Sequence, residues 1–152
     1  MAIVIISLLG AASGLLGSFA MTGFMLKISS AYGKQVDMLE ALGSFFKGKS
    51  EGAQKLGKRI HALSGFFFGT VYFIGMHLMG ALTFPHAIFL GIGFGLFHGL
   101  VVSYVLMFYA SLKHPIEEYR NATIVEGVLH LAGHFIFGTV VGLMGALFSI
   151  IL

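Results

Sequence analysis

The sequence of 152 residues contains no cysteine and few charged residues. Without cysteine the chain can form no disulfide, and it can hold neither a thiolate-bound metal nor an iron–sulfur cluster. Any metal must therefore be bound by His, carboxylate, Tyr or Met side chains. Charged residues make up 10% of the chain, whereas a soluble domain has about 25%. Together with a hydrophobic content of 57%, this balance is typical of a membrane protein.

Motifs of the common soluble enzyme classes are also missing. The chain has no phosphate-binding Gly loop with Lys, no nucleophile elbow and no His-Glu-x-x-His zinc motif. The candidates for function are therefore the polar residues that interrupt apolar runs.

Four apolar runs are long enough to cross a bilayer, which requires about 20 residues. They cover approximately residues 2–26, 60–83, 86–112 and 122–152. The sequence thus predicts an all-α integral membrane protein with one domain, residues 1–152, built as a bundle of four transmembrane helices. The first run is longer than a signal-peptide core, so we expect it to be retained. The short turn at Pro85 predicts that the second and third helices are antiparallel neighbours.

Residues 32–58, between the first two runs, form the only segment that looks soluble. Apolar residues recur there at helical spacing, at Val36, Leu39 and Leu42. Charged residues separate them, at Lys34, Asp37, Glu40 and Lys47. This pattern predicts an amphipathic helix on the cytoplasmic membrane surface. A helix packed on the bundle itself explains the pattern equally well.

Basic residues are concentrated in two connections. Seven lie at the end of the first run or just after it, namely Lys27, Lys34, Lys47, Lys49, Lys55, Lys58 and Arg59. Lys113 and Arg120 lie between the third and fourth runs. The positive-inside rule therefore predicts that both connections are cytoplasmic and that both termini face outward, in an inner or plasma membrane. This topology explains the net charge of +3 better than a nucleic-acid partner does.

A polar ladder interrupts the fourth run. Glu126, His130 and His134 are spaced by four residues, so they share one helix face. Ionisable groups inside a membrane are costly and usually face the bundle interior, which makes them functional candidates by default.

The second and fourth runs resemble each other. Residues 61–71 and 130–140 share a His, a Phe and the tetrad Phe-Gly-Thr-Val. The match places His61 and His130 at similar depth, in the cytoplasmic half of parallel helices. We therefore expect His61, Glu126, His130 and His134 to converge. His98, a marginal member, lies about 7 Å outward of His134 at about 1.5 Å of helix rise per residue.

The other histidines have simpler interpretations. We expect His77 to be packed or interfacial, beside two methionines. His86 should lie on the outer surface, and His114 should cap a helix or face water, because it precedes a proline.

The first functional hypothesis is a b-type haem with His61 and His130 as axial ligands. A flat macrocycle needs helix faces without bulk, and three glycines lie on or beside the faces of these histidines: Gly65, Gly69 and Gly138. His98 and His134 would be neighbouring or alternative ligands. Because protein would fill both axial positions, such a haem suits electron transfer, with a quinone as one candidate partner.

Two alternatives remain open. One is a transition metal bound by His61, His130, His134 and Glu126, a donor set that suits Fe, Cu, Zn or Mn. The other is a cofactor-free accessory or assembly subunit of a larger membrane complex. There the ladder would be a hydrogen-bond network or a proton path. Small-residue faces such as Gly10 with Gly14 also permit a homo-oligomer.

Overall fold

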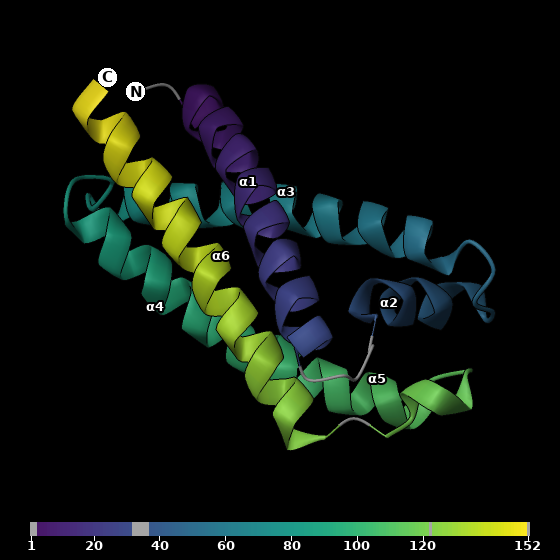
Figure 1. The fold of residues 1–152 in the computed structure, drawn as a ribbon. Helices are drawn as coiled ribbons and strands as arrows, with labels where there is room; N and C mark the ends of the chain where they lie inside the picture. Colours follow the sequence, from purple (N-terminus) through teal and green to yellow (C-terminus); the bar gives the residue numbers. More distant parts are fainter. Residues whose placement is uncertain (1–2, 32–36, 122, 152) are drawn as a thin grey trace.

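The computed structural model describes residues 3–31, 37–121 and 123–151, and these residues form helices without any strand (Figure 1). In chain order the elements are α1 (Ile3–Ala31), α2 (Met38–Lys47), α3 (Ala53–Leu78), α4 (His86–Leu100), the π-helix η1 (Val101–Leu106), α5 (Met107–Lys113), the 3-10 turn η2 (Glu117–Tyr119) and α6 (Ile124–Ile151). The predicted all-α class is confirmed. Some residues of the predicted elements lie outside the described residues: Ala2 of the first span, residues 32–36 of the first connection, and Ala122 and Leu152 of the fourth span.

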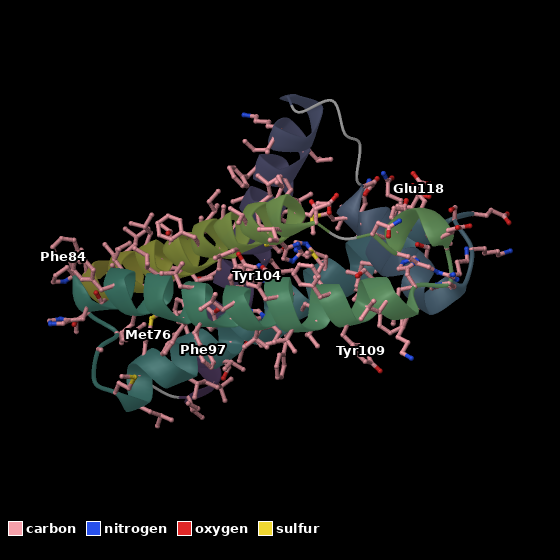
Figure 2. All side chains as sticks on the ribbon, turned by 90° about the horizontal axis from the view of Figure 1, so that it is seen from below. Met76, Phe84, Phe97, Tyr104, Tyr109 and Glu118 are labelled. Atoms are coloured by element: carbon pink, nitrogen blue, oxygen red, sulfur yellow. The ribbon has the colours of Figure 1, made fainter. Side chains whose placement is uncertain are left out.

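Three helical stretches are long and apolar enough to cross a membrane: Ile3–Ile28, His86–Lys113 and Ile124–Ile151. They correspond to the first, third and fourth predicted spans. Large apolar side chains are exposed along them, and Phe97 and Tyr109 point away from the rest of the molecule (Figure 2). Helix α3, the predicted second span, has 26 residues but is not among the three. Lys55, Lys58 and Arg59 lie in its first two turns, and two histidines lower the apolar character of the remainder.

Helix α1 crosses α3 at a contact centred on four glycines. Gly10 and Gly14 of α1 meet Gly69 and Gly65 of α3. A Cβ on Gly14 would lie 2.0 Å from the carbonyl oxygen of Gly65, and a Cβ on Gly69 would lie 2.3 Å from that of Gly10. Small residues allow helix backbones to approach this closely. Because the Gly10–Gly14 face is used within the chain, it is not free for a second copy.

Helix α4 crosses α6 in the same way. Gly91 and Gly95 meet Gly138 and Gly142, and a Cβ on Gly138 would lie 2.2 Å from the carbonyl oxygen of Gly91. Helix α1 also packs on α6 and joins the two pairs. The fold therefore consists of two helix pairs, α1–α3 and α4–α6, and the helices of each pair pack closely through glycines.

Helices α3 and α4 do not pack closely, although a short turn connects them. Their backbones diverge from that turn, and α3 packs mainly on α1 and α2 while α4 packs on α6 (Figure 1). Large rings fill the space between them: the centroids of Tyr72 and Phe94 lie 5.2 Å apart, and those of Phe68 and His98 lie 3.9 Å apart. The prediction of close antiparallel neighbours is therefore correct for the turn but not for the packing.

Helix α2 packs on the first turns of α3. The Asp37 carboxylate caps its N-terminus by accepting hydrogen bonds from the backbone N–H groups of Leu39 and Glu40, both at 3.0 Å. Gly43 lies directly against α3, where a Cβ would come within 1.8 Å of the Ala53 carbonyl oxygen. Of the two interpretations of this segment, a helix packed on its own bundle matches these contacts.

His114 joins α2 to the connection before α6. It is the C-cap of α5, as one of the two expectations has it, and its side chain is buried and does not face water. The backbone N–H of Ile116 donates to its Nδ1 at 3.1 Å, so Nε2 carries the proton and donates to the Ala41 carbonyl oxygen at 3.0 Å. The Arg120 Nε in turn donates to the His114 carbonyl oxygen at 2.7 Å. The two basic connections therefore lie at the same end of the molecule.

Candidate functional site

Four histidines from three helices gather beside the N-terminus of α2. His61 comes from α3, His98 from α4, and His130 and His134 from α6. The ring centroid of His134 lies 4.8 Å from that of His98 and 4.8 Å from that of His130. His61 lies close enough to interact electrostatically with His130 and His134. We call these four residues the histidine cluster.

His134 and His98 are each held through one ring nitrogen. The Nδ1–H of His134 donates to the carbonyl oxygen of His130, one helical turn earlier, at 2.9 Å. This contact fixes the tautomer of His134 and leaves a lone pair on Nε2. The Nδ1 of His98 is hydrogen-bonded to the Tyr72 hydroxyl at 3.1 Å.

His61 and His130 are held in the same manner by other helices. The Nδ1 of His61 is hydrogen-bonded to the Thr22 hydroxyl of α1 at 3.3 Å. The Nδ1 of His130 lies 3.3 Å from the Met38 sulfur, at the first residue of α2. Three of the four imidazoles thus have an oxygen partner on Nδ1, and the fourth has a thioether.

The Nε2 atoms of the cluster have no such partners. Within the part of the chain that the structure describes, no hydrogen bond of these four histidines uses Nε2. In metal sites, ligating histidines usually bind with one ring nitrogen and are oriented through the other by a carbonyl, carboxylate or water. His61, His98 and His134 have this division of roles, with an oxygen partner on Nδ1.

The side chains do not form a closed metal site as they stand. Across residues 3–31, 37–121 and 123–151, no group of three or more His, Asp or Glu side chains is arranged to hold a metal ion. The rings of His130 and His134 are tilted by 36° and lie alongside each other, so their nitrogens do not converge. Metal binding would require these rings to turn about their side-chain torsions.

Glu126 has a different role from the predicted one. Its carboxylate accepts a hydrogen bond from the backbone N–H of Thr123, three residues earlier. Thr123 precedes the first residue of α6, so the two form the reciprocal end of a capping box, Thr-x-x-Glu. The Thr-x-x-Glu spacing is visible in the sequence, but the four-residue spacing to His130 indicates a different role for the same residue. A carboxylate directed at the helix start does not contribute to the histidine cluster.

The glycines predicted to flank a haem lie at the helix crossings. A Cβ on Gly65 would meet Ser18 at 2.7 Å, and Gly69 and Gly138 press against Gly10 and Gly91. Neighbouring backbone therefore fills the space beside these three residues. Gly99, in contrast, borders the cluster, because a Cβ there would lie 2.7 Å from the Cβ of His134.

The core of the bundle is mainly apolar toward the end away from α2. Beyond Tyr72, the buried core consists of apolar side chains, including Ile6, Phe73, Met76 and Val141. His86 lies at the other end of the molecule, exposed and hydrogen-bonded to the Thr83 hydroxyl at 3.3 Å. The histidine cluster therefore approaches one end of the molecule only, the end covered by α2.

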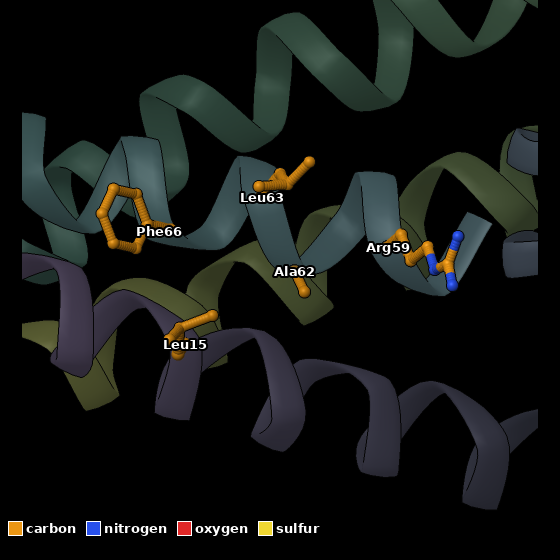
Figure 3. Close-up of a pocket in the computed structure, with 5 residues that line it drawn as sticks. All are labelled: Leu15, Arg59, Ala62, Leu63 and Phe66. Atoms are coloured by element: carbon orange, nitrogen blue, oxygen red, sulfur yellow. The ribbon is translucent and has the colours of Figure 1, made fainter. Parts of the chain in front are cut away.

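Two open pockets lie along α1 and α3. One of about 480 Å³ is lined by Leu15, Arg59, Ala62, Leu63 and Phe66 (Figure 3). A second of about 280 Å³ borders His61 and Thr22. Neither is lined by His130, so neither lies between the two predicted axial ligands.

Three residues of the site were not predicted. Tyr72 follows His61 by 11 residues, about three helical turns, so a helical-wheel argument could have placed them on one face. Thr22 and Met38 reach the cluster from other helices, and no local pattern in the sequence indicates it.

Comparisons of the chain with protein-family models, with curated proteins and with solved structures find no match. The function is therefore inferred from the site alone.

Proposed function

We propose that this chain is a four-span membrane subunit whose histidine cluster binds one redox-active transition-metal ion for electron transfer. The observation that carries the proposal is the division of roles in His61, His98 and His134. Each has its Nδ1 engaged by an oxygen partner, and none of their hydrogen bonds among the described residues uses Nε2. Imidazole nitrogen is a good ligand for Cu, Fe, Zn and Ni, and of these Cu and Fe change oxidation state readily.

A single ion fits the cluster better than a haem does. A bis-His haem would need a flat gap between His61 and His130. The space beside His130 is taken by the His134 ring, at 4.8 Å between centroids, and by the Met38 sulfur. The glycine faces that could accommodate a macrocycle are occupied by neighbouring helices.

A cofactor-free role explains the cluster less well. Interhelical hydrogen bonds would account for each Nδ1 contact, but not for the gathering of four imidazoles without Nε2 partners. A proton path is also disfavoured, because the core beyond Tyr72 is apolar.

The proposal requires α3 to cross the bilayer with the other three helices. Its 26 residues extend about 39 Å at 1.5 Å per residue, more than the hydrocarbon core of about 30 Å. Helix α3 packs closely on α1 through the glycine contact, and α1 is apolar enough to cross the bilayer. We place α2 and both basic connections on the cytoplasmic side, following the positive-inside rule.

The test is metal analysis of the protein purified in mild detergent, together with absorption spectra of the oxidised and dithionite-reduced forms. We expect one metal ion per chain and no Soret band. His134→Ala and His98→Ala should each lower metal affinity about tenfold or more, the range seen for changes at metal sites. His86→Ala, far from the cluster, should retain full metal content, and helix content should be equal in all variants.

The possible outcomes separate the hypotheses. A Soret band in the wild type that is lost in His61→Ala and His130→Ala would show that the cofactor is a haem and not a single metal ion. A wild-type protein that stays metal-free, both as isolated and after incubation with Cu, Fe and Zn salts, would overturn the metal proposal. The cofactor-free subunit would then be the better interpretation.

A further inference from the structure

We infer that the ion is Cu(I) and that the thioether of Met38, with His130, is part of its ligand set. This inference rests on the proposed metal site and names its metal. His130 is the cluster histidine whose Nδ1 faces a sulfur atom instead of an oxygen atom.

The Met38–His130 pair already has the spacing of two ligands on one ion. Metal–sulfur and metal–nitrogen bonds of about 2.3 and 2.0 Å at a tetrahedral angle put the two atoms about 3.5 Å apart. The observed separation of the Met38 sulfur and the His130 Nδ1 is 3.3 Å. Transfer of the ring proton to Nε2 would leave the Nδ1 lone pair directed toward the space beside the sulfur.

The position of Met38 is fixed by the fold. It is the first residue of α2, directly after the Asp37 cap, and α2 is held on α3 by the Gly43 contact. The second oxygen of Asp37 also accepts a hydrogen bond from Gln54 Nε2 of α3, at 2.5 Å. A methionine that only filled a gap would need no such support, because its flexible side chain adapts to irregular spaces.

A second thioether lies on the same stretch of α6. The sulfur of Met25, on α1, would lie 3.4 Å from a Cβ on Gly133, the residue between the two histidines and next to His134. Met25 and Met38 thus approach α6 from two helices at the level of the cluster.

This mixture of donors selects among metals. Soft thioether sulfur favours Cu(I), whereas Zn²⁺ and Fe²⁺ bind imidazole, with or without carboxylate, and have no preference for a thioether. The chain has no thiolate, and the one carboxylate near the cluster, Glu126, caps α6 instead. Imidazole with thioether is therefore the donor set that remains, and it matches Cu(I).

The experiment compares Cu(I) and Zn(II) binding in full-length protein in detergent, under anaerobic reducing conditions, with a chromophoric Cu(I) chelator as competitor. Met38→Leu conserves volume and removes only the sulfur. We expect it to weaken Cu(I) binding about tenfold or more and to leave Zn(II) binding unchanged. Met79→Leu, exposed at the opposite end of α3, is the matched control and should bind like the wild type. X-ray absorption at the copper edge should show sulfur scattering that decreases in Met38→Leu.

The result distinguishes this inference from the proposed function. Histidine-dependent metal binding with no sulfur scattering, and with equal Cu(I) affinity in Met38→Leu and wild type, would overturn the Cu(I)–thioether assignment alone. Absence of any metal binding by the wild type would overturn both. If Met38→Leu lost Cu(I) and Zn(II) to the same extent, Met38 would be a packing residue and the assignment would be wrong.

Discussion

At the scale of single residues, the role of a side chain depends more on the groups that it contacts than on its residue type. His114 is buried with both ring nitrogens engaged, and it joins two connections. His134 is buried with one nitrogen engaged and one free. Helical spacing places His130 and His134 on one face, but it cannot show which groups from other helices meet them.

Substitution of Glu126 distinguishes its two interpretations, as a helix cap and as a metal ligand. Because its carboxylate caps α6, Glu126→Ala should lower the free energy of unfolding by about 1 kcal/mol, the usual effect of losing a helix cap. Glu126→Gln should retain most of the stability, since Gln serves in the same capping box. Metal content should stay equal to wild type in both variants. The measurements are thermal unfolding in detergent and metal analysis.

A loss of metal in Glu126→Ala and Glu126→Gln, with unchanged stability, would restore the carboxylate as a ligand. It would also show that the capping contact with Thr123 is not the role of this residue.

At the scale of helices, much of the structure could be predicted from the sequence. Long apolar runs and glycines four apart predict membrane-type helices with close contacts, and the structure has both. The choice of partners could not be predicted. The short turn before α4 favoured pairing with α3, but glycine faces on α1 and α6 permit closer backbone approach than the aromatic faces between α3 and α4. The choice of packing partners depends on the faces of all the helices together, and no single segment of the sequence indicates it.

The glycine contact between α1 and α3 can be tested by adding one methyl group. A Cβ on Gly69 would lie 2.3 Å from the Gly10 carbonyl oxygen and 2.4 Å from the Gly14 Cα, both backbone atoms that cannot turn aside. We expect Gly69→Ala to lower the free energy of unfolding by about 1–3 kcal/mol, as overpacking does. The measurement is unfolding of the purified protein in mixed micelles.

Gly93→Ala is the matched control, since nothing lies within 4 Å of a Cβ there. Its stability should equal or exceed that of the wild type, because Ala is about 1 kcal/mol better than Gly inside a helix. Equal stability of Gly69→Ala and Gly93→Ala would contradict the close crossing of α1 and α3.

At the scale of the whole molecule, the fold separates a polar end from an apolar end. Side chains tipped with nitrogen and oxygen gather mainly at the end that carries α2 and Glu118 (Figure 2). The start of α1 and the end of α6 lie near each other, away from α2 and α5 (Figure 1). The hydrogen bond from His114 to Ala41 brings the two basic connections together at the polar end. The topology predicted from charge would place this end in the cytoplasm, and the histidine cluster would then be reached from there.

The absence of cysteine allows this topology to be tested with single introduced cysteines. Ser50, Thr83 and Asn121 are exposed and lie in three different connections. If α3 crosses the bilayer and the basic connections are cytoplasmic, a membrane-impermeant maleimide should label Thr83→Cys in intact cells. It should label Ser50→Cys and Asn121→Cys only after permeabilisation.

If α3 does not cross, Ser50→Cys and Thr83→Cys will react alike and Asn121→Cys oppositely. If the chain is inserted the other way, Ser50→Cys and Asn121→Cys will react in intact cells and Thr83→Cys will be protected. The labelling pattern therefore tests the fourth span and the orientation together, and it determines which side of the membrane supplies metal to the cluster.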